Sequence, residues 1–238
     1  MLTAYIPGYY YMDYWYLILV VPALIITVWA QIKVSTTFKK YSKYAVGSGL
    51  TGVQASELIQ QRHGLQVPCS QIAGSMTDHY DPRSNSIRLS ETVYGVSSVA
   101  AVGVAAHETG HALQYAEGYW PIKLRMRLVP ITNFASAASP WLLMLGLVLS
   151  FLPLAYLGVA FFGFAVIFQL VTLPVEFNAS ARALSALVEG QMLTQEELKA
   201  AKKVLSAAAM TYVAALLVSL MQFLRLLLIV MGRGRRND

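Results

Sequence analysis

The sequence predicts a mainly α-helical, polytopic membrane protein with about four transmembrane helices, a helix that carries a metal-binding motif, and a small β-hairpin. Only 13% of its 238 residues are charged and 56% are hydrophobic, whereas roughly a quarter of the residues in an average soluble domain are charged. The hydrophobic residues gather in long runs, as helices embedded in lipid require. The motif HETGH at residues 107–111 places two histidines one helical turn apart.

Four apolar runs are long enough to cross the hydrocarbon core of a bilayer, which is about 30 Å thick. They cover residues 15–32, 131–152, 154–175 and 207–224, the last continuing past Arg225 to residue 231. The first run could instead be a cleaved signal peptide. Residues 1–14 contain no Lys or Arg, however, so the basic region that begins a signal peptide is missing. We therefore expect a retained N-terminal anchor.

Basic residues flank the apolar runs. The net charge is +6, but nucleic-acid binding would need a basic folded face, so we expect no nucleic-acid partner. The segments between the spans contain Lys33, Lys39, Lys40, Lys43, Lys123, Arg125, Arg127, Arg182, Lys199, Lys202 and Lys203. By the positive-inside rule these segments are cytoplasmic and the N-terminus is outside. Four spans would return the C-terminus to the outside although it carries Arg233, Arg235 and Arg236, so the last helix could also be only partly inserted.

The one substantial polar stretch, residues 36–96, lies between the first run and the motif. It contains an amphipathic helix that begins at residue 51 and ends at Gly64, followed by strand-like pieces at residues 65–67 and 71–77. Turn-forming residues at 81–86 predict a β-hairpin over residues 75–90. Ser97 or Ser98 should cap the motif helix, and Thr194 with Glu197 forms a capping box that opens a helix continuing into the fourth span. Cys69 is the single cysteine, so it cannot form an intramolecular disulfide and should be a packed side chain.

The motif His107-Glu108-Thr109-Gly110-His111 is typical of zinc hydrolases. Both imidazoles lie on one helical face and can bind the same metal ion, and Glu108 can accept a proton from a water at that metal. The alternative is two histidines that occur in a buried helix by chance. The Glu108 carboxylate would then be unpaired among alanines and a leucine, which is costly. We therefore favour a metal.

A catalytic zinc needs a third protein ligand. In the metzincin pattern a glycine and then a ligand follow the second histidine; here those positions hold Gln114 and Glu117. Without the glycine the helix has no reason to turn back. Glu176 is the better candidate because it shares a face with small residues that permit close helix approach. Alone, it could simply stabilise a helix N-terminus, since Pro174 is expected to end the third span or to open a new helix.

These features divide the chain into five parts. We expect an anchor at 1–33, a lobe with hairpin and motif helix at 34–118, a basic linker with a transmembrane hairpin at 119–175, the third-ligand helix with a cytoplasmic connector at 176–206, and a last span with a basic tail at 207–238.

Three ordered blocks resemble the bacterial YugP-like neutral zinc metallopeptidase family, and the similarity covers most of the chain. They are residues 105–114 (AAHETGHALQ), residues 77–82 (TDHYDP) with 88–90 (RLS), and residues 173–177 (LPVEF). More distantly, the chain is similar to membrane gluzincins of the HtpX and CAAX-processing type, whose third ligand lies in an E-x-x-A-D pattern. Glu176 and Ala179 match that pattern, whereas Ser180 replaces the aspartate. The YugP-like proteins often carry aspartate at the position of Asn178.

The resemblance implies a zinc metallopeptidase with a gluzincin-like motif helix, located in the bacterial inner membrane. The basic loops place its active site on the cytoplasmic side. Zinc would be bound by His107, His111 and Glu176, and Glu108 would be the general base that activates a water for peptide-bond hydrolysis. Candidates for stabilising the transition state or orienting the ligands are Arg182, His79, Tyr80 and Asn178. Expected partners are the lipid bilayer and membrane-associated or unfolded polypeptide substrates.

The rival interpretation is a membrane scaffold or adaptor whose metal is structural and which hydrolyses nothing. A metal without an open coordination position would favour it. A transporter is less favoured, because the spans carry few ionisable residues besides Arg225.

Overall fold

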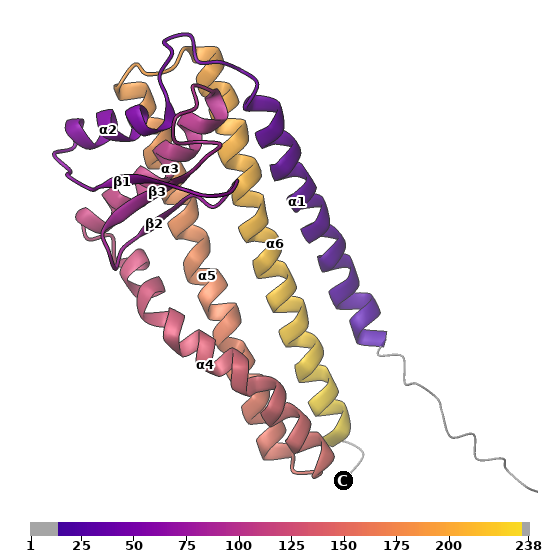
Figure 1. The fold of residues 1–238 in the computed structure, drawn as a ribbon. Coiled ribbons are helices and arrows are strands. Elements are labelled where there is room, and N and C mark those ends of the chain that lie inside the picture. The colour runs from indigo at the N-terminus through magenta and orange to yellow at the C-terminus, as the bar shows by residue number, and fades with distance from the viewer. Residues whose placement is uncertain (1–13, 235–238) are drawn as a thin grey trace, which may run out of the picture.

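The protein consists of a long helical stem with a mixed α/β head at one end (Figure 1). The computed structural model describes residues 14–234. The stem contains η1 (Tyr16–Val20), a π-helix that leads into α1 (Val21–Tyr41), together with α4 (Trp120–Val148), α5 (Leu152–Glu189) and α6 (Gln195–Gly234). The head contains α2 (Gly52–Arg62), β1 (Cys69–Ile72), β2 (His79–Asp81), β3 (Ser86–Ser90) and α3 (Val99–Ala116). The predicted fold class is confirmed.

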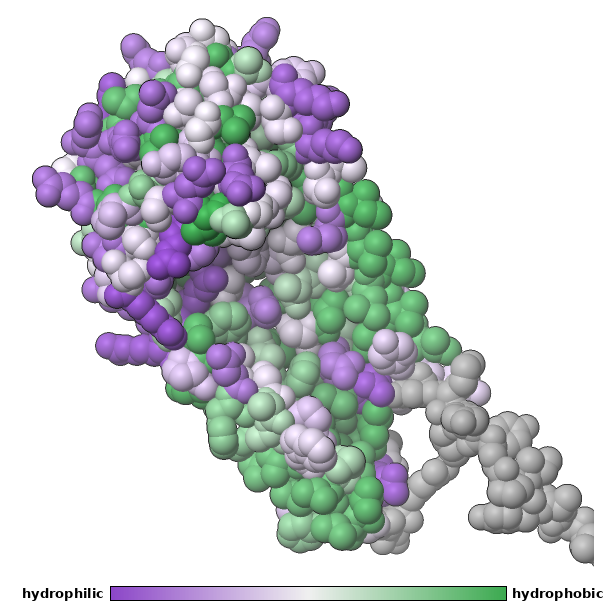
Figure 2. Space-filling view, viewed as in Figure 1, coloured by the Kyte–Doolittle hydropathy of each residue, from purple (hydrophilic) through white to green (hydrophobic). Residues whose placement is uncertain are grey.

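The four stem helices are each long and apolar enough to cross a membrane. Less than a third of the most apolar window of each is buried inside the protein, so apolar side chains face outward, as contact with lipid requires. Hydrophilic residues gather on the head, and the stem is mostly hydrophobic (Figure 2). The choice of a retained anchor over a signal peptide rests on residues 1–13, which lie outside the described residues. Arg235 and Arg236 also lie outside them.

All four stem helices extend beyond the predicted apolar runs, and in α4 and α5 the extension contradicts a prediction. α4 begins at Trp120, so the basic residues assigned to a linker lie in its first turns instead. Pro121, near the helix start, lacks an N–H that would be unpaired there anyway. The break predicted near residue 175 is also wrong, because α5 continues through Pro174. Proline removes one backbone hydrogen bond but is tolerated in membrane helices, where neighbouring helices compensate.

The small sheet has the strand order β1-β3-β2. The predicted hairpin is present as antiparallel β2 and β3, and Asp81 closes its turn by accepting bonds from the Arg83 N–H (2.9 Å) and the Ser84 hydroxyl (2.8 Å). The strand-like pieces were misplaced: the third strand is β1, which pairs parallel to β3. Fully buried Ile87 and Leu89 on β3 fix the register, because a one-residue slip would expose both.

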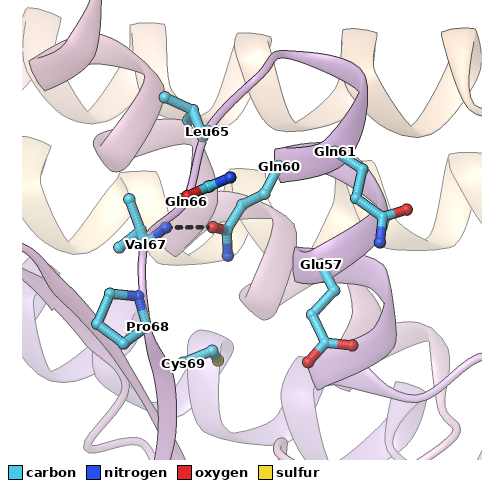
Figure 3. Close-up of a pocket in the computed structure, with 8 residues that line it drawn as sticks. All are labelled: Glu57, Gln60, Gln61, Leu65, Gln66, Val67, Pro68 and Cys69. Atoms are coloured by element: carbon cyan, nitrogen blue, oxygen red, sulfur yellow. Dashed lines mark hydrogen bonds between the residues drawn. The ribbon is translucent and has the colours of Figure 1, made fainter.

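A chain of buried polar groups ties α2 to the motif helix. Gln60 points toward the segment before β1 and accepts the Val67 N–H at 2.7 Å (Figure 3). Its amide nitrogen donates to the Ser56 hydroxyl at 3.3 Å, and Ser56 lies 2.8 Å from the hydroxyl of Thr109. Thr109 donates in turn to the Ala105 carbonyl at 2.8 Å, so Ser56 is the donor to Thr109. Thr109, the third residue of the motif, thus links the motif helix to α2.

Candidate metal centre

The motif helix α3 lies between the sheet and the stem. It begins as predicted at Ser98, whose hydroxyl accepts the Ala101 N–H at 3.2 Å. It ends just before Gly118, which has a φ of +72°, a conformation that glycine adopts without strain. His107 and His111 lie one turn apart with ring centroids 4.8 Å from each other. Local sequence signals therefore set both ends of the helix that presents the histidines.

Gly110 allows α5 to come into backbone contact with α3. A Cβ atom at this position would lie 2.6 Å from the Ala179 carbonyl oxygen, well inside van der Waals contact. Glu176 precedes Ala179 by one turn on the same face of α5. Gly103 of the same helix lies against α6 instead, where an added Cβ atom would be 3.5 Å from the Cβ of Ala201. Gly110 is thus the position that brings Glu176 to the two histidines.

The three predicted ligands meet around one point. The Glu176 Oε2 atom lies 3.3 Å from His107 Nε2 and 3.5 Å from His111 Nε2, and the ligand atoms of all three lie within 4.8 Å of one another. A tetrahedral zinc with bonds of about 2.0–2.1 Å has ligand atoms roughly 3.3 Å apart. Two imidazole nitrogens and a carboxylate oxygen are a donor set that zinc prefers. The residues present therefore fit the ion.

Hydrogen bonds set the orientation of both imidazoles. The Gln114 amide nitrogen donates to the Val175 carbonyl and to Asn178 Oδ1, each at 2.8 Å. Its oxygen therefore accepts from His111 Nδ1 at 3.0 Å, which leaves Nε2 free of a proton to bind a metal. On the other histidine, the Ser180 hydroxyl lies 3.1 Å from His107 Nδ1. Ser180 is therefore the side chain that contacts the Nδ1 side of this histidine.

Arg125 of α4 contacts the outer oxygen of the third candidate ligand. Its guanidinium donates to Glu176 Oε1 at 2.9 Å, while Oε2 faces the histidines. Glu176 is almost fully buried, and a carboxylate there needs a compensating charge. The two oxygens of one carboxylate therefore have separate partners, a guanidinium outside and the candidate metal position inside.

Glu108 is buried behind the histidines and faces β2. Its Oε2 atom accepts the backbone N–H of Tyr80 at 3.0 Å. Burial raises the pKa of Glu108 to about 7, and the nearby His107 and the Tyr80 N–H oppose this shift. The β2 strand is itself fixed by Asp78, which accepts the Ser90 N–H at 2.7 Å and the Ser90 hydroxyl at 3.0 Å. The sheet thus holds the carboxylate in one orientation.

A cavity of about 220 Å³ connects these groups between head and stem. His107, Glu108, His111 and Glu176 line it, together with His79 and Tyr80 from β2, Arg125 from α4 and Tyr212 from α6. The His79 Nδ1 atom lies 2.8 Å from the Thr77 carbonyl, so its other nitrogen is available to the cavity. The Tyr80 hydroxyl donates to Asn85 at 2.7 Å and is thereby committed to the hairpin turn.

Arg182 and Glu117 lie outside the cavity lining. The Arg182 guanidinium bonds Glu117 at 2.6 Å and Asn178 at 2.8 Å, and it lies 6.0 Å from the Tyr119 ring. Glu117, the metzincin-type alternative, is half exposed and is not in the cluster of possible ligands found among residues 14–234. Asn178 contacts Gln114 and thereby supports His111.

Sequence reasoning overlooked three contributors to this site. We interpreted Arg125 only as a basic residue that indicates membrane topology. We noted Gln114 only because the metzincin pattern has a glycine at that position, and we treated Tyr212 only as part of the fourth apolar run. Arg125 and Tyr212 reach the cavity from α4 and α6, and Gln114 contacts His111 and α5 behind it, so these roles depend on contacts between helices. One signal was available for Gln114, since a glutamine three residues after His111 lies on the same helical face.

Comparisons with known proteins identify the family of the chain. The family described as "Putative neutral zinc metallopeptidase" matches residues 16–231. A curated relative from Bacillus subtilis (strain 168), "Putative membrane protease YugP", is 46% identical over 223 residues, which is 93% of this chain and 99% of the relative. No solved structure matches.

Proposed function

The chain belongs to the neutral zinc metallopeptidase family, and on this premise we propose that it is a zinc-dependent membrane endopeptidase. The observation that carries the proposal is the convergence of His107, His111 and Glu176 on one point of a cavity that also contains Glu108. A purely structural zinc site is closed by four protein ligands, whereas a catalytic site has three and an open position. The three-residue cluster beside a cavity favours catalysis.

The chemistry follows from the positions of the side chains. Zinc, when bound, would polarise a water and lower its pKa toward neutrality. Glu108 accepts the proton of the attacking water and passes it to the leaving amine, in a role that needs a carboxylate oxygen facing the scissile bond. The Tyr80 N–H holds one oxygen of Glu108 and leaves the other for this transfer. His79 and Tyr212 line the cavity and are the donors we assign to the developing oxyanion.

Extended substrates fit the free edge of β2. The strand order β1-β3-β2 makes β2 an edge, and both His79 and Tyr80 line the cavity. An extended peptide can add to such an edge through main-chain hydrogen bonds, here to the Tyr80 carbonyl, since the Tyr80 N–H is bonded to Glu108. This arrangement would lay the peptide across the open face of the cavity, with a carbonyl next to Glu108.

The stem side of the cavity also presents apolar side chains. It contains Ile122, Met126 and Val129 of α4 and Phe168 of α5. These helices are candidate membrane spans, so the cavity lies where the head meets the bilayer. We therefore propose that substrates are membrane-associated or unfolded polypeptides. We also propose that the head lies in the cytoplasm, because exposed lysines concentrate at the head end of the stem, as the positive-inside rule expects of cytoplasmic segments.

Purified full-length protein in detergent tests the proposal through two variants. With an unfolded polypeptide as substrate, Glu108→Gln should retain stoichiometric zinc while hydrolysis falls about 10²–10⁴-fold, because the proton acceptor is lost. Glu176→Ala should lose most of its zinc. Normal cleavage by Glu108→Gln would refute the mechanism, and stoichiometric zinc in Glu176→Ala would refute the ligand assignment. Zinc in the wild type with no hydrolysis of any unfolded polypeptide would favour the scaffold interpretation.

A further inference from the structure

A second, larger cleft of about 800 Å³ lies between α1 and α6, at the head end of the stem. Its α1 wall presents Trp29, Lys33, Lys40 and Tyr41, at intervals that place them on one helical face. Its α6 wall presents Lys199, Lys202 and Lys203. None of the residues that bind the candidate metal lines this cleft, so it is separate from the proposed active site.

Five lysines in one cleft have no acidic counterpart. All five side chains are exposed, no Asp or Glu lines the cleft, and none of the five forms an ion pair among residues 14–234. The local contacts are instead aromatic, with Lys33 5.1 Å from the Trp29 ring and Lys40 5.4 Å from the Tyr41 ring. Such a concentration of like charge is stabilised when an anion binds.

The cleft spans the boundary between the polar and apolar parts of the stem. Below the lysines it is lined by Trp29, Ala207 and Met210. On α1, Ile25, Val28 and Ile32 are more than half exposed, as lipid-facing residues are, and Lys33 follows directly. Tryptophan is enriched at this level of a bilayer, where lipid headgroups lie. The cations therefore lie at headgroup depth and the apolar residues at acyl-chain depth.

We propose that this cleft binds an anionic phospholipid, with the lipid phosphate among the five lysines and the upper acyl chain against Trp29 and Met210. Basic pockets between transmembrane helices are a known way to recognise such headgroups. Lysine ammonium groups suit a phosphate as mobile point charges. The amphipathic lining distinguishes this ligand from a free phosphate ion, which would not use the apolar floor.

Native mass spectrometry of the full-length protein in detergent tests the proposal. Phosphatidylglycerol and phosphatidylcholine with identical acyl chains are added in competition. The wild type should prefer phosphatidylglycerol by at least about tenfold. The cleft variant Lys33→Gln/Lys40→Gln/Lys202→Gln should lose this preference, whereas Lys33→Arg/Lys40→Arg/Lys202→Arg should retain it because the charge remains.

A matched variant distinguishes binding in the cleft from a general attraction of anionic lipids to the basic end of the stem. Lys39→Gln/Lys43→Gln/Lys123→Gln removes the same charge from exposed lysines that do not line the cleft. It should keep the wild-type preference, and an equal loss in both triple variants would overturn the proposal. Glycerol phosphate, added at a tenfold excess over the lipid, should displace little of the bound phosphatidylglycerol. Complete displacement would show that the cleft binds anions without specificity for lipid, and it would also overturn the proposal.

Discussion

The Arg125 guanidinium and the outer oxygen of the Glu176 carboxylate are 2.9 Å apart, while the inner oxygen faces two histidine nitrogens. The pair joins α4 to α5 at the candidate metal position. A guanidinium beside one oxygen fixes the rotation of the carboxylate and offsets its burial. Arg125 is therefore a positioning residue for the third ligand.

Replacing Arg125 tests this role. Arg125→Gln should weaken zinc binding about 10–100-fold, the usual effect of removing the partner of a metal ligand. The measurement is a competitive zinc titration with a chelator of known affinity. Arg127→Gln is the matched control, because Arg127 is an exposed residue on the same helix and no ion pair of it is found among residues 14–234. Equal zinc affinity in Arg125→Gln and wild type would contradict the assignment.

Two glycine substitutions on α3 should change the stability of the protein in opposite directions. Gly110→Ala places a Cβ 2.6 Å from the Ala179 carbonyl oxygen, so α5 must move, at a cost of about 1–3 kcal/mol. Gly103→Ala meets only ordinary contacts, the nearest at 3.5 Å, and should stabilise by up to about 1 kcal/mol through helix propensity. Thermal unfolding in detergent should show a lower midpoint for the first variant and an equal or higher one for the second. Stability unchanged by Gly110→Ala would argue against the backbone contact.

Ser180 should contribute to zinc affinity through His107, whose Nδ1 atom lies 3.1 Å from its hydroxyl. Ser180→Ala removes this partner and should weaken zinc binding about tenfold or more. Ser180→Asp should restore it, because a carboxylate can accept a hydrogen bond from the same Nδ1–H group. Ser185→Ala, at an exposed position of the same helix, is the control. The same competition with a chelator measures the zinc affinity of all three variants. A loss of zinc affinity in Ser180→Asp as large as that in Ser180→Ala would contradict the prediction.

Cys69 should be a slow nucleophile. Burial raises the pKa of its thiol to about 11. At pH 8 the thiolate fraction is then about 100-fold below that of an ordinary cysteine, and the higher intrinsic reactivity of a more basic thiolate recovers only part of this. Alkylation by iodoacetamide, followed by mass spectrometry, should be at least about tenfold slower than in the denatured protein. Its rate should keep rising up to about pH 10, whereas a plateau near pH 9 would show an unshifted thiol.

Many features of the fold could be predicted because their causes are local. Apolar runs predicted four stem helices, and short-range capping at Ser98 and at Thr194 predicted where two helices begin. The strands were harder to predict, because the position of β1 depends on its parallel pairing with β3. This pairing is a contact between segments that are apart in the sequence. Pro174 misled the prediction because a proline inside a membrane helix can cost one backbone hydrogen bond without ending the helix, and α5 continues to Glu189.

The sequence by itself determined the candidate chemistry: two histidines at helical spacing, a glutamate between them, and a later glutamate on a small-residue face. These are properties of residue type and period, which any helix containing them would share. Only the tertiary structure decided that Gly110 lets α5 approach, that Ser180 and Gln114 orient the imidazoles, and that Arg125 and Tyr212 enter the same cavity. Those relationships join residues from four helices, and helix packing, which no local pattern encodes, sets the distances between them.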